Sequence, residues 1–188
     1  PKDLSDELIE VMGKSKKICK HLHLPVQSGS SKILKKMNRH YTKEQYLELV
    51  EKIRKNVPDV SLTTDIIVGF PGETEEDFEE SYEFVKNIHF YETHIFKYSR
   101  RQGTKAAVME GQLTEAVKSI RSEKMIALHE IRAKEYETSM IGKTLELLLE
   151  EEVEINGKTY FMAHSKEYVR AVIEKTKDHK VNDLVRAK

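Results

Sequence analysis

The sequence is poor in the residues that stabilise small secreted or metal-stapled proteins. Among 188 residues there are one cysteine, no tryptophan and four prolines. The single thiol, Cys19, cannot form an internal disulfide and cannot supply a CxxC-type metal framework. We expect Cys19 to be a small buried hydrophobe at the start of a strand, because free cysteines are among the residues most often buried.

The sequence also lacks an excess of either charge. Lys and Arg together number 32, and so do Asp and Glu, which gives a formal net charge of zero. No overall field draws the chain to nucleic acid, so any RNA contact must come from a local basic patch. No apolar run is long enough to cross a bilayer and no signal peptide is recognisable, so we expect a cytoplasmic protein with no membrane partner.

What is present is a hydrophobic content of 38%, arranged in alternating strand-like and helix-like segments. Ser5, Thr42 and Thr74 are typical helix N-caps, and Gln45 completes a capping box with Thr42. Gly13 is expected to end the first helix. This alternation predicts βα units around a parallel sheet with right-handed crossovers. The expected segments are helix 4–12, strand 20–26, helix 31–37, a helix from 42 that ends at Pro58, strand 61–70, a helix from 74, strand 92–98 and helix 114–137.

The pattern changes to a period of two after residue 139. Leucines within 145–149 alternate with polar neighbours, and Asn156-Gly157 is a strong two-residue hairpin signal. Roughly four or five short strands suggest a small β-barrel of OB-like size. The expected domains are therefore an α/β domain over residues 1–138 and an all-β domain over residues 139–188.

Three segments rich in small, polar or glycine residues lie at the carboxyl ends of the expected parallel strands. In a barrel of βα units the loops after the strands meet at that end and form the site. Glycine and small side chains let the backbone approach a ligand closely. The three segments are PVQSGSS at 25–31, TTDIIVGFPGETEEDF at 63–78 and YSRRQGTKAA at 98–107.

These motifs, in this order and spacing, resemble the radical S-adenosylmethionine (SAM) methylthiotransferases. The resemblance rests on HLHLPVQSGS, DIIVGFPGET and YSRRQGTKAA, and it covers almost the whole chain, from about residue 3 to 188. The β-rich end is similar to the TRAM domain, an RNA-binding module, that ends those proteins. The resemblance implies an α/β part that is a partial TIM-like (β/α) barrel of about three βα units, followed by an all-β, OB-like TRAM barrel.

The resemblance implies a transferase of tRNA processing, which adds a methylthio group to C2 of a modified adenosine in the anticodon stem-loop. The wording HIFKYSRRQGTKAA at 94–107 is closest to the branch that acts on threonylcarbamoyl-adenosine, and the branch that acts on isopentenyl-adenosine comes next. A related branch modifies an aspartate of a ribosomal protein. A stand-alone RNA-binding module without catalysis is the alternative from another class of protein.

The family uses SAM and two [4Fe–4S] clusters, and it holds the SAM-cleaving cluster with a CxxxCxxC loop. Cys19 alone cannot supply three thiolates. We therefore expect a C-terminal fragment of a longer enzyme that is inactive by itself, with no catalytic residue and no metal ligand of its own. The exposed edge of an incomplete barrel is expected to pair in a non-native dimer.

The resemblance places SAM near two of the motifs. Hydroxyl and amide groups of PVQSGSS suit the ribose and methionine of SAM, although they equally suit the end of a strand and the cap of the next helix. The DIIVG segment would support the adenine, although it also fits an ordinary buried strand. A carboxylate beside that apolar run needs a partner. The expected cofactor-binding residues are Gln27, Ser28, Ser30, Asp65, Ile67, Val68 and Gly69.

The resemblance also implies substrate contacts. Arg101 suits the carboxylate of a threonylcarbamoyl group, with the SAM carboxylate and a structural ion pair as rival partners. His21 and His23 either line the cavity or belong to a plain strand, and two histidines alone are only half a metal site. Cations among aromatics in the all-β domain are typical of RNA-binding barrels, away from the acidic run at 150–154. The expected substrate-binding residues are His23, Tyr98, Arg101, Lys143, Tyr168 and Arg170.

Overall fold

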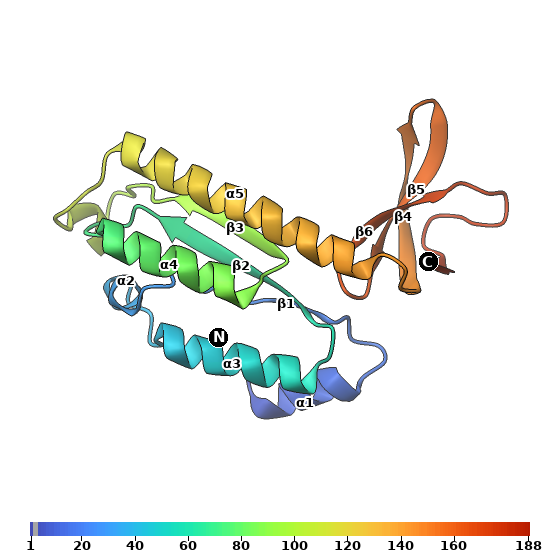
Figure 1. Cartoon of the computed structure of the whole chain (residues 1–188), viewed down its shortest axis with the longest axis horizontal. Helices are drawn as coiled ribbons and strands as arrows, with labels where there is room; N and C mark the ends of the chain where they lie inside the picture. The colour runs from blue at the N-terminus through green and yellow to red at the C-terminus, as the bar shows by residue number, and fades with distance from the viewer. Residues whose placement is uncertain (2–3) are drawn as a thin grey trace.

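The computed structural model describes residues 1 and 4–188, which form a parallel sheet covered by helices and, after a long last helix, an antiparallel sheet (Figure 1). This confirms the mixed α/β architecture followed by short strands. The helices are α1 (Asp6–Lys14), α2 (Ser31–Lys36), α3 (Lys43–Asn56), α4 (Glu75–Ile88), α5 (Glu115–Met140) and the 3₁₀ helix η1 (Lys105–Val108). The strands are β1 (His21–His23), β2 (Ser61–Val68), β3 (Glu92–Lys97), β4 (Leu145–Ile155), β5 (Lys158–Ser165), β6 (Arg170–Glu174) and β7 (Leu184–Ala187).

The parallel sheet has three strands in the order β1-β2-β3, and its two faces differ. Successive side chains of a strand point to opposite faces. Ile66 and Val68 of β2 are buried in one core with side chains of α1, α3, α4 and α5. Asp65 and Ile67 point the other way and stay partly exposed. The helices therefore cover one face, and the opposite face is open near the carboxyl end of β2; closure into a TIM-like barrel stays a prediction.

The helices begin where the sequence predicts. The Thr42 hydroxyl accepts a hydrogen bond from the Gln45 backbone N–H, and the Gln45 side-chain oxygen accepts one from the Thr42 backbone N–H, so the capping box is confirmed. Thr74 and Ser5 are confirmed N-caps as well. Gly13 as the end of α1 is wrong, because the helix continues to Lys14. An added Cβ at Gly13 would lie 2.2 Å from the Asn56 carbonyl oxygen, so this glycine allows α1 to pack closely on the end of α3.

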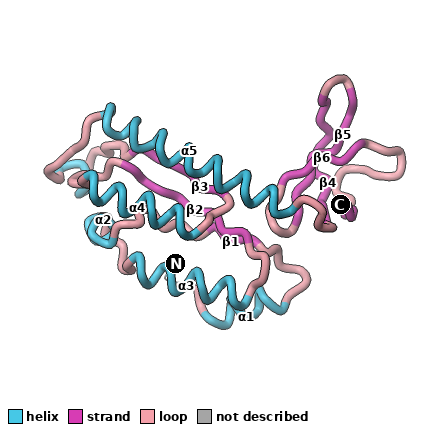
Figure 2. Tube along the Cα trace, viewed as in Figure 1, coloured by secondary structure: helices cyan, strands magenta, loops and turns pink. Residues whose placement is uncertain are grey.

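The antiparallel sheet has the order β6-β5-β4-β7 and is strongly curled (Figure 2). Asn156 and Gly157 join β4 to β5 with φ angles of 53° and 76°, which confirms the two-residue hairpin. Its core is a small cluster separate from that of the parallel sheet. The buried members of this cluster are Leu147, Leu149, Phe161 and Ala163. An OB-like TRAM barrel stays a prediction.

The junction of the two sheets lies beside the start of β1. α5 ends at Met140, and residues 141–144 connect it to β4, which begins at Leu145. The Lys166 ammonium donates a 3.1 Å hydrogen bond to the Lys16 carbonyl across this junction. Cys19 lies in the irregular segment before β1 and is exposed, so its expected burial is wrong. Within residues 1 and 4–188, no helix is long and apolar enough to cross a membrane.

Candidate functional site

A pocket of about 470 Å³ opens where the parallel strands end. Five residues expected from the sequence lie in its wall, although they come from three motifs far apart in the chain. Their meeting follows from the parallel topology, because all three strands end at the same edge. The lining residues are Gln27, Asp65, Ile67, Phe70, Phe96, Lys97, Tyr98, Ser99, Arg101, Thr104 and Ala106.

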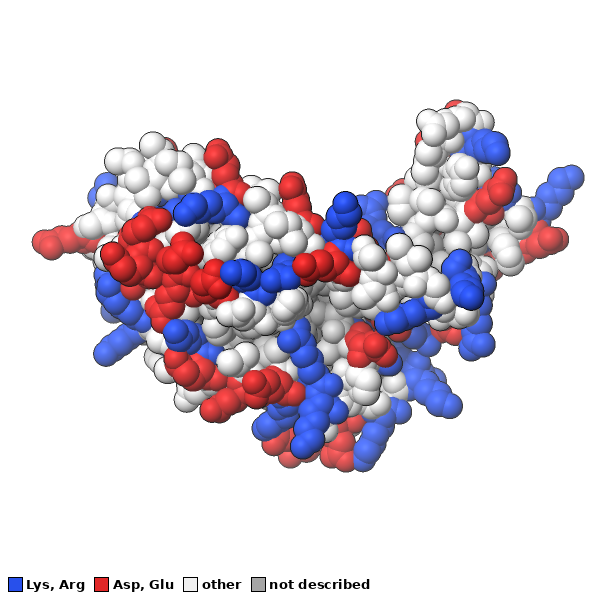
Figure 3. All heavy atoms as spheres, in the orientation of Figure 1, with Lys and Arg blue, Asp and Glu red and all other residues white. Residues whose placement is uncertain are grey.

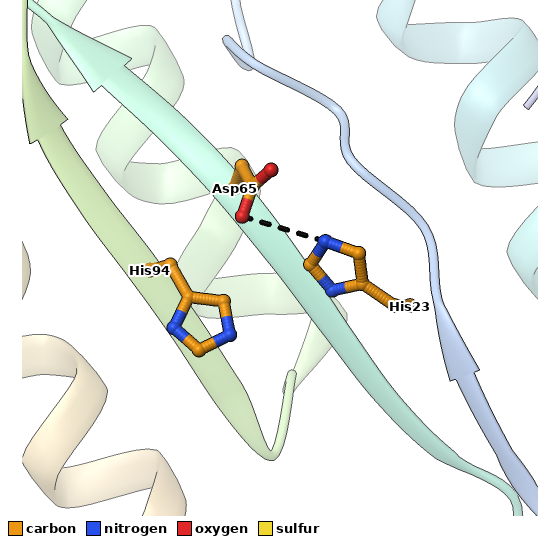
Figure 4. Close-up of side chains that lie close together, drawn as sticks. All are labelled: His23, Asp65 and His94. Atoms are coloured by element: carbon orange, nitrogen blue, oxygen red, sulfur yellow. Dashed lines mark ion pairs between the residues drawn. The ribbon is translucent and has the colours of Figure 1, made fainter.

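The polar part of the open face extends from this pocket along β1 and β3 (Figure 4). His23 Nε2 lies 3.5 Å from Asp65 Oδ1. His94 is the direct neighbour of Asp65 in the β2–β3 register, and its ring centre lies 5.7 Å from that of His23. The Thr63 hydroxyl lies 2.9 Å from His23 Nδ1 and 3.0 Å from His21 Nε2. Asp65 thus lies beside a histidine, at a separation longer than that of a good hydrogen bond.

The loop after β3 separates the roles of two adjacent arginines. Arg100 Nε donates a 2.7 Å hydrogen bond to the Ala107 carbonyl and so holds the loop together. The Arg101 carbonyl accepts a 2.8 Å hydrogen bond from the Thr104 hydroxyl, while its guanidinium is exposed and lines the pocket. The hydroxyl of Tyr98 is buried and finds no hydrogen-bond partner among the described residues. A ligand in the pocket therefore meets the exposed side chain of Arg101, and Lys97 lies in the same wall.

The Gln27-Ser-Gly-Ser segment is held by backbone hydrogen bonds to β2. Gln27 has a φ of 72° and bonds through its N–H to the Asp65 carbonyl and through its carbonyl to the Ile67 N–H, each at 2.9 Å. Ser28 and Ser30 are buried behind the pocket; the Ser30 hydroxyl contacts Asp77 on α4 at 3.4 Å. Gln27 faces the pocket and the two serines do not. A cofactor contact for the serines stays a prediction.

Gly29 allows this segment to pack closely on α4, which leads to a testable expectation. An added Cβ would lie 2.6 Å from Phe84 Cβ and 2.8 Å from Ser81 Cα, and the Gly29 N–H donates a 2.7 Å hydrogen bond to the Ser81 hydroxyl. Overpacking of this kind costs about 1–3 kcal/mol. Gly29→Ala should lower the free energy of unfolding by that amount in urea denaturation. The exposed Lys35→Ala is the control, expected within about 0.5 kcal/mol of wild type; equal midpoints for both would refute the close packing.

The turn after β2 is built around a buried ion pair. Val68 points into the helical core, and Gly69 has a φ of 74°. The Gly69 N–H donates a 2.7 Å hydrogen bond to Glu73 Oε2, which also accepts one of 2.6 Å from Arg121 Nη1. Neither Val68 nor Gly69 lies in the pocket wall. They shape the strand end from behind, and direct contact with SAM stays a prediction for them.

The substrate residues expected in the antiparallel sheet gather near the junction instead of the pocket. The Tyr168 ring stacks on His21 of β1 with ring centres 4.0 Å apart, and on His164 with 5.5 Å. Burial lowers the pKa of His21 below its ordinary value. Lys143 lies 3.7 Å from Asp59, and an Arg170 nitrogen lies 3.7 Å from the Met162 sulfur. Tyr168 and Arg170 therefore belong to a second surface.

Several residues of the site escaped the sequence analysis. His94, Phe96 and Thr104 were not singled out, although His94 and Phe96 have the spacing of one strand face and Thr104 belongs to the GT of the third motif. The alternation of HIFKYS was the available signal. Glu73 and Arg121 are 48 residues apart, and no local pattern links them.

Comparisons with known proteins show which family the chain resembles. The radical SAM superfamily matches residues 1–85, so this part of the chain has the sequence of a radical SAM domain. The tRNA-2-methylthio-N(6)-dimethylallyladenosine synthase of Caldicellulosiruptor saccharolyticus is 54% identical over 150 residues, covering 80% of this chain and 32% of that protein. The chain belongs to the radical SAM methylthiotransferase family.

Two other relatives extend the comparison. The tRNA-2-methylthio-N(6)-dimethylallyladenosine synthase of Carboxydothermus hydrogenoformans is 51% identical over 164 residues, covering 85% of this chain and 37% of that protein. The threonylcarbamoyladenosine tRNA methylthiotransferase MtaB of Bacillus subtilis is 44% identical over 176 residues, covering 93% of this chain and 39% of that protein. The chain thus spans about a third of the length of the curated relatives that it matches.

The two kinds of cofactor that the family implies fit this chain differently. Apolar Ile67 and Phe70 beside polar Gln27 and Asp65 form a wall that suits a nucleoside such as the adenosine of SAM. A [4Fe–4S] cluster does not fit, because cluster ligation takes three or four thiolates and Cys19 is the chain's single cysteine.

Proposed function

We propose that this chain is the part of a tRNA methylthiotransferase that forms one wall of the SAM and substrate cavity and grips the tRNA. The whole protein would add a methylthio group to C2 of a modified adenosine beside the anticodon, in the cytoplasm. The observation that carries the proposal is the pocket into which Gln27, Asp65, Ile67, Tyr98 and Arg101 converge from three motifs. The cluster ligands would come from outside this chain, so the chain alone is expected to be inactive.

The residues of the pocket would divide the work of binding. SAM supplies the methyl group when it is bound. Ile67 and Phe70 would contact the adenine, while Gln27 and Asp65 would hydrogen-bond ribose hydroxyls. Arg101 would bind a carboxylate with two parallel hydrogen bonds. These side chains bind and orient, and none of them is proposed to react.

The second surface would hold the RNA. The stacked rings of His21, Tyr168 and His164 offer a platform on which a base can stack. Glu150 and Glu152 in the acidic run are paired with His164 and Lys175, which reduces their repulsion of phosphate. Acidic side chains gather over α4 on the helix-covered face (Figure 3). The tRNA is therefore expected on the open face of the parallel sheet and on the antiparallel sheet.

The proposal also specifies which modified adenosine is the substrate. The dimethylallyladenosine relative of Caldicellulosiruptor saccharolyticus is more similar to this chain, at 54% identity against 44% for MtaB. The match to MtaB covers more of this chain, at 93% against 80%. An exposed Arg101 at the pocket favours a substrate with a carboxylate, which threonylcarbamoyl-adenosine has and isopentenyl-adenosine lacks. We therefore propose threonylcarbamoyl-adenosine, with isopentenyl-adenosine and a ribosomal aspartate as the outcomes that the test separates. The dimer through the free edges of β1 and β3 also remains a proposal.

The test is titration of the whole chain with anticodon stem-loops that carry threonylcarbamoyl-adenosine, isopentenyl-adenosine or plain adenosine, at two salt concentrations. Binding should weaken with salt, because phosphate contacts release counterions. Arg101→Ala should weaken binding of the threonylcarbamoyl loop about 10- to 100-fold and leave the plain loop unchanged, since a charged hydrogen-bond pair contributes about 1.5–3 kcal/mol. The affinity of Arg101→Lys for the threonylcarbamoyl loop should lie between those of wild type and Arg101→Ala. Arg39→Ala, a change at an exposed residue, should bind as wild type does.

The alternatives give different results. Equal affinity for all three loops would support a stand-alone RNA-binding module. A preference for the isopentenyl loop that survives Arg101→Ala would move the substrate to that branch. No RNA binding, together with binding of a ribosomal-protein peptide, would refute the tRNA proposal.

A further inference from the structure

Three metal-ligating side chains meet on the open face of the parallel sheet. His23, Asp65 and His94 each offer one ligand atom, and these three atoms lie within 4.8 Å of one another. The side chains come from β1, β2 and β3, so three adjacent strands contribute one ligand each (Figure 4). The carboxylate is on the central strand, between the two imidazoles.

The rest of the structure prepares His23 for such a role. A metal-bound histidine usually uses its other ring nitrogen in a hydrogen bond, which fixes the tautomer and the ring orientation. The Thr63 hydroxyl lies 2.9 Å from His23 Nδ1, which leaves Nε2 directed at Asp65. Thr63 itself is buried and held against His21. Thr63 therefore supplies the hydrogen-bond partner for the ring nitrogen that does not face Asp65.

The contact between His23 and Asp65 does not satisfy the two groups. At 3.5 Å it is longer than a good hydrogen bond. Among the described residues the Asp65 carboxylate has no other side-chain partner that approaches it more closely. A divalent cation between the ligand atoms would use the lone pairs that this contact leaves free.

We propose that His23, Asp65 and His94 bind one divalent transition-metal ion, such as Zn²⁺ or Co²⁺. Two imidazoles and one carboxylate are a donor set for transition metals, whereas Mg²⁺ and Ca²⁺ prefer oxygen ligands alone. Three protein ligands leave at least one coordination position open for water or an oxygen of a bound molecule. Asp65 also lines the pocket, so the open position faces the same space as Arg101.

The site can close on an ion with small movements. In a tetrahedral site with bonds of about 2.0–2.1 Å, the ligand atoms are about 3.3 Å apart. The His23–Asp65 distance of 3.5 Å is already close to that value. His94 must approach, and its ring is exposed, so rotation of the side chain meets little resistance. The sequence suggested no metal site, because only strand register brings Asp65 and His94 to His23. The proposed metal site shares Asp65 with the proposed SAM pocket, and its test measures metal binding in the absence of tRNA and SAM.

Two other places in the described part of the chain serve as controls for metal binding. His89 lies 3.7 Å from Glu135, in the same kind of histidine–carboxylate contact and with both side chains exposed. Cys19 is an exposed thiol that could bind metal by itself. His89→Ala and Cys19→Ser are therefore controls for metal taken up outside the proposed site.

The experiment is titration of the chelator-treated chain with Co²⁺, followed by its visible d–d absorption, with Zn²⁺ displacement measured by calorimetry. We expect saturation at one ion per chain in wild type, His89→Ala and Cys19→Ser. His23→Ala, Asp65→Asn and His94→Ala should each weaken binding more than about 10-fold. Thr63→Val should weaken it about 10- to 100-fold, as loss of an outer-shell partner does. Circular dichroism of each variant checks that it is folded.

Four results would overturn the proposal. One is the absence of saturable binding at one ion per chain. Another is binding that survives in all three ligand variants. The third is loss of binding in Cys19→Ser, which would place the metal at the thiol. Loss in His23→Ala and Asp65→Asn with full affinity in His94→Ala would also refute the three-ligand site.

Discussion

Replacing Arg121 by methionine is expected to lower the free energy of unfolding by about 3–5 kcal/mol at neutral pH, because removing one partner of a buried ion pair leaves an uncompensated charge. The side chains of Glu73 and Arg121 are 1% and 5% exposed. Arg121 Nη1 donates to the Glu73 carbonyl at 3.1 Å as well as to its carboxylate, and Nη2 donates to Glu75 at 3.0 Å. Methionine keeps much of the volume and removes every one of these donors.

The pH dependence of this loss has a definite sign. Burial raises the pKa of Glu73, and Arg121 opposes that rise. Without Arg121 the pKa of Glu73 in the folded state lies still further above its value in the unfolded state. An acid with a raised folded pKa destabilises the fold while it is ionised, and protonation relieves the cost as the pH falls. The deficit of Arg121→Met should therefore be larger at about pH 8 than at about pH 5.

Urea unfolding of wild type and variants at these two pH values measures the effect. The double variant Glu73→Gln with Arg121→Met should recover part of the loss, because no charge is left buried. Lys124→Ala is the surface control: Lys124 lies 3.9 Å from Glu75, both side chains are at least half exposed, and such a pair is worth at most about 1 kcal/mol. An Arg121→Met loss no larger than that of Lys124→Ala would refute the buried pair.

The Glu73–Arg121 ion pair matters for the site because it fixes the carboxyl end of β2, beside which the pocket opens. Glu73 binds the Gly69 N–H, and Gly69 follows the last residue of β2. Arg121 thereby ties α5 to the turn that leads away from the pocket. The guanidinium also lies 5.3 Å from the Phe78 ring centre on α4. One side chain of α5 therefore fixes the turn after β2 against two helices.

Local signals in the sequence predicted the elements well. Thr42 with Gln45, Thr74 and Asn156-Gly157 act through hydrogen bonds and φ angles within four residues of themselves, so the sequence contains all that they need. Gly13 shows the limit of such signals. A glycine near a helix end resembles a C-cap. Here the position has no room for a Cβ, because α3 packs against it and the contacting residue is more than forty positions away in the chain.

Contacts set by strand register were beyond the sequence. Asp65 was expected to need a partner. Its neighbours His23 and His94 lie on the two adjacent strands, and no local sequence pattern gives the register in which those strands pair with β2. A shift of one residue in either pairing would send the partner to the other face. The family motifs singled out Gln27 and Arg101, and both line the pocket. They gave no warning of His94, which the resemblance does not single out.

Replacing Phe161 by alanine is expected to unfold the antiparallel sheet while the parallel sheet stays folded. Phe161 is fully buried, and its truncation costs about 3–5 kcal/mol. The core that it shares with Leu147, Leu149 and Ala163 is small, and small domains have little stability to lose. The core of the parallel sheet shares no buried residue with this cluster. Loss of one core therefore leaves the other intact.

Hydrogen exchange read by mass spectrometry resolves the two sheets. In Phe161→Ala, peptides from 145–187 should lose protection and peptides from 43–97 should keep it. Leu184→Ala is the control in the same sheet, since Leu184 is 66% exposed and exposed changes stay within about 0.5 kcal/mol. Loss of protection along the whole chain would show that the two sheets unfold as one unit.

The same variant separates the two binding surfaces. If the stacked rings around Tyr168 hold the tRNA, a melted antiparallel sheet removes Tyr168 and His164 from the platform and stem-loop affinity falls. The pocket draws all of its lining from residues 27–106, so the SAM binding proposed for it should persist. Stem-loop binding at full strength by Phe161→Ala would move the RNA contact to the parallel sheet. The open face with Arg101 would then hold both the RNA and the base to be modified.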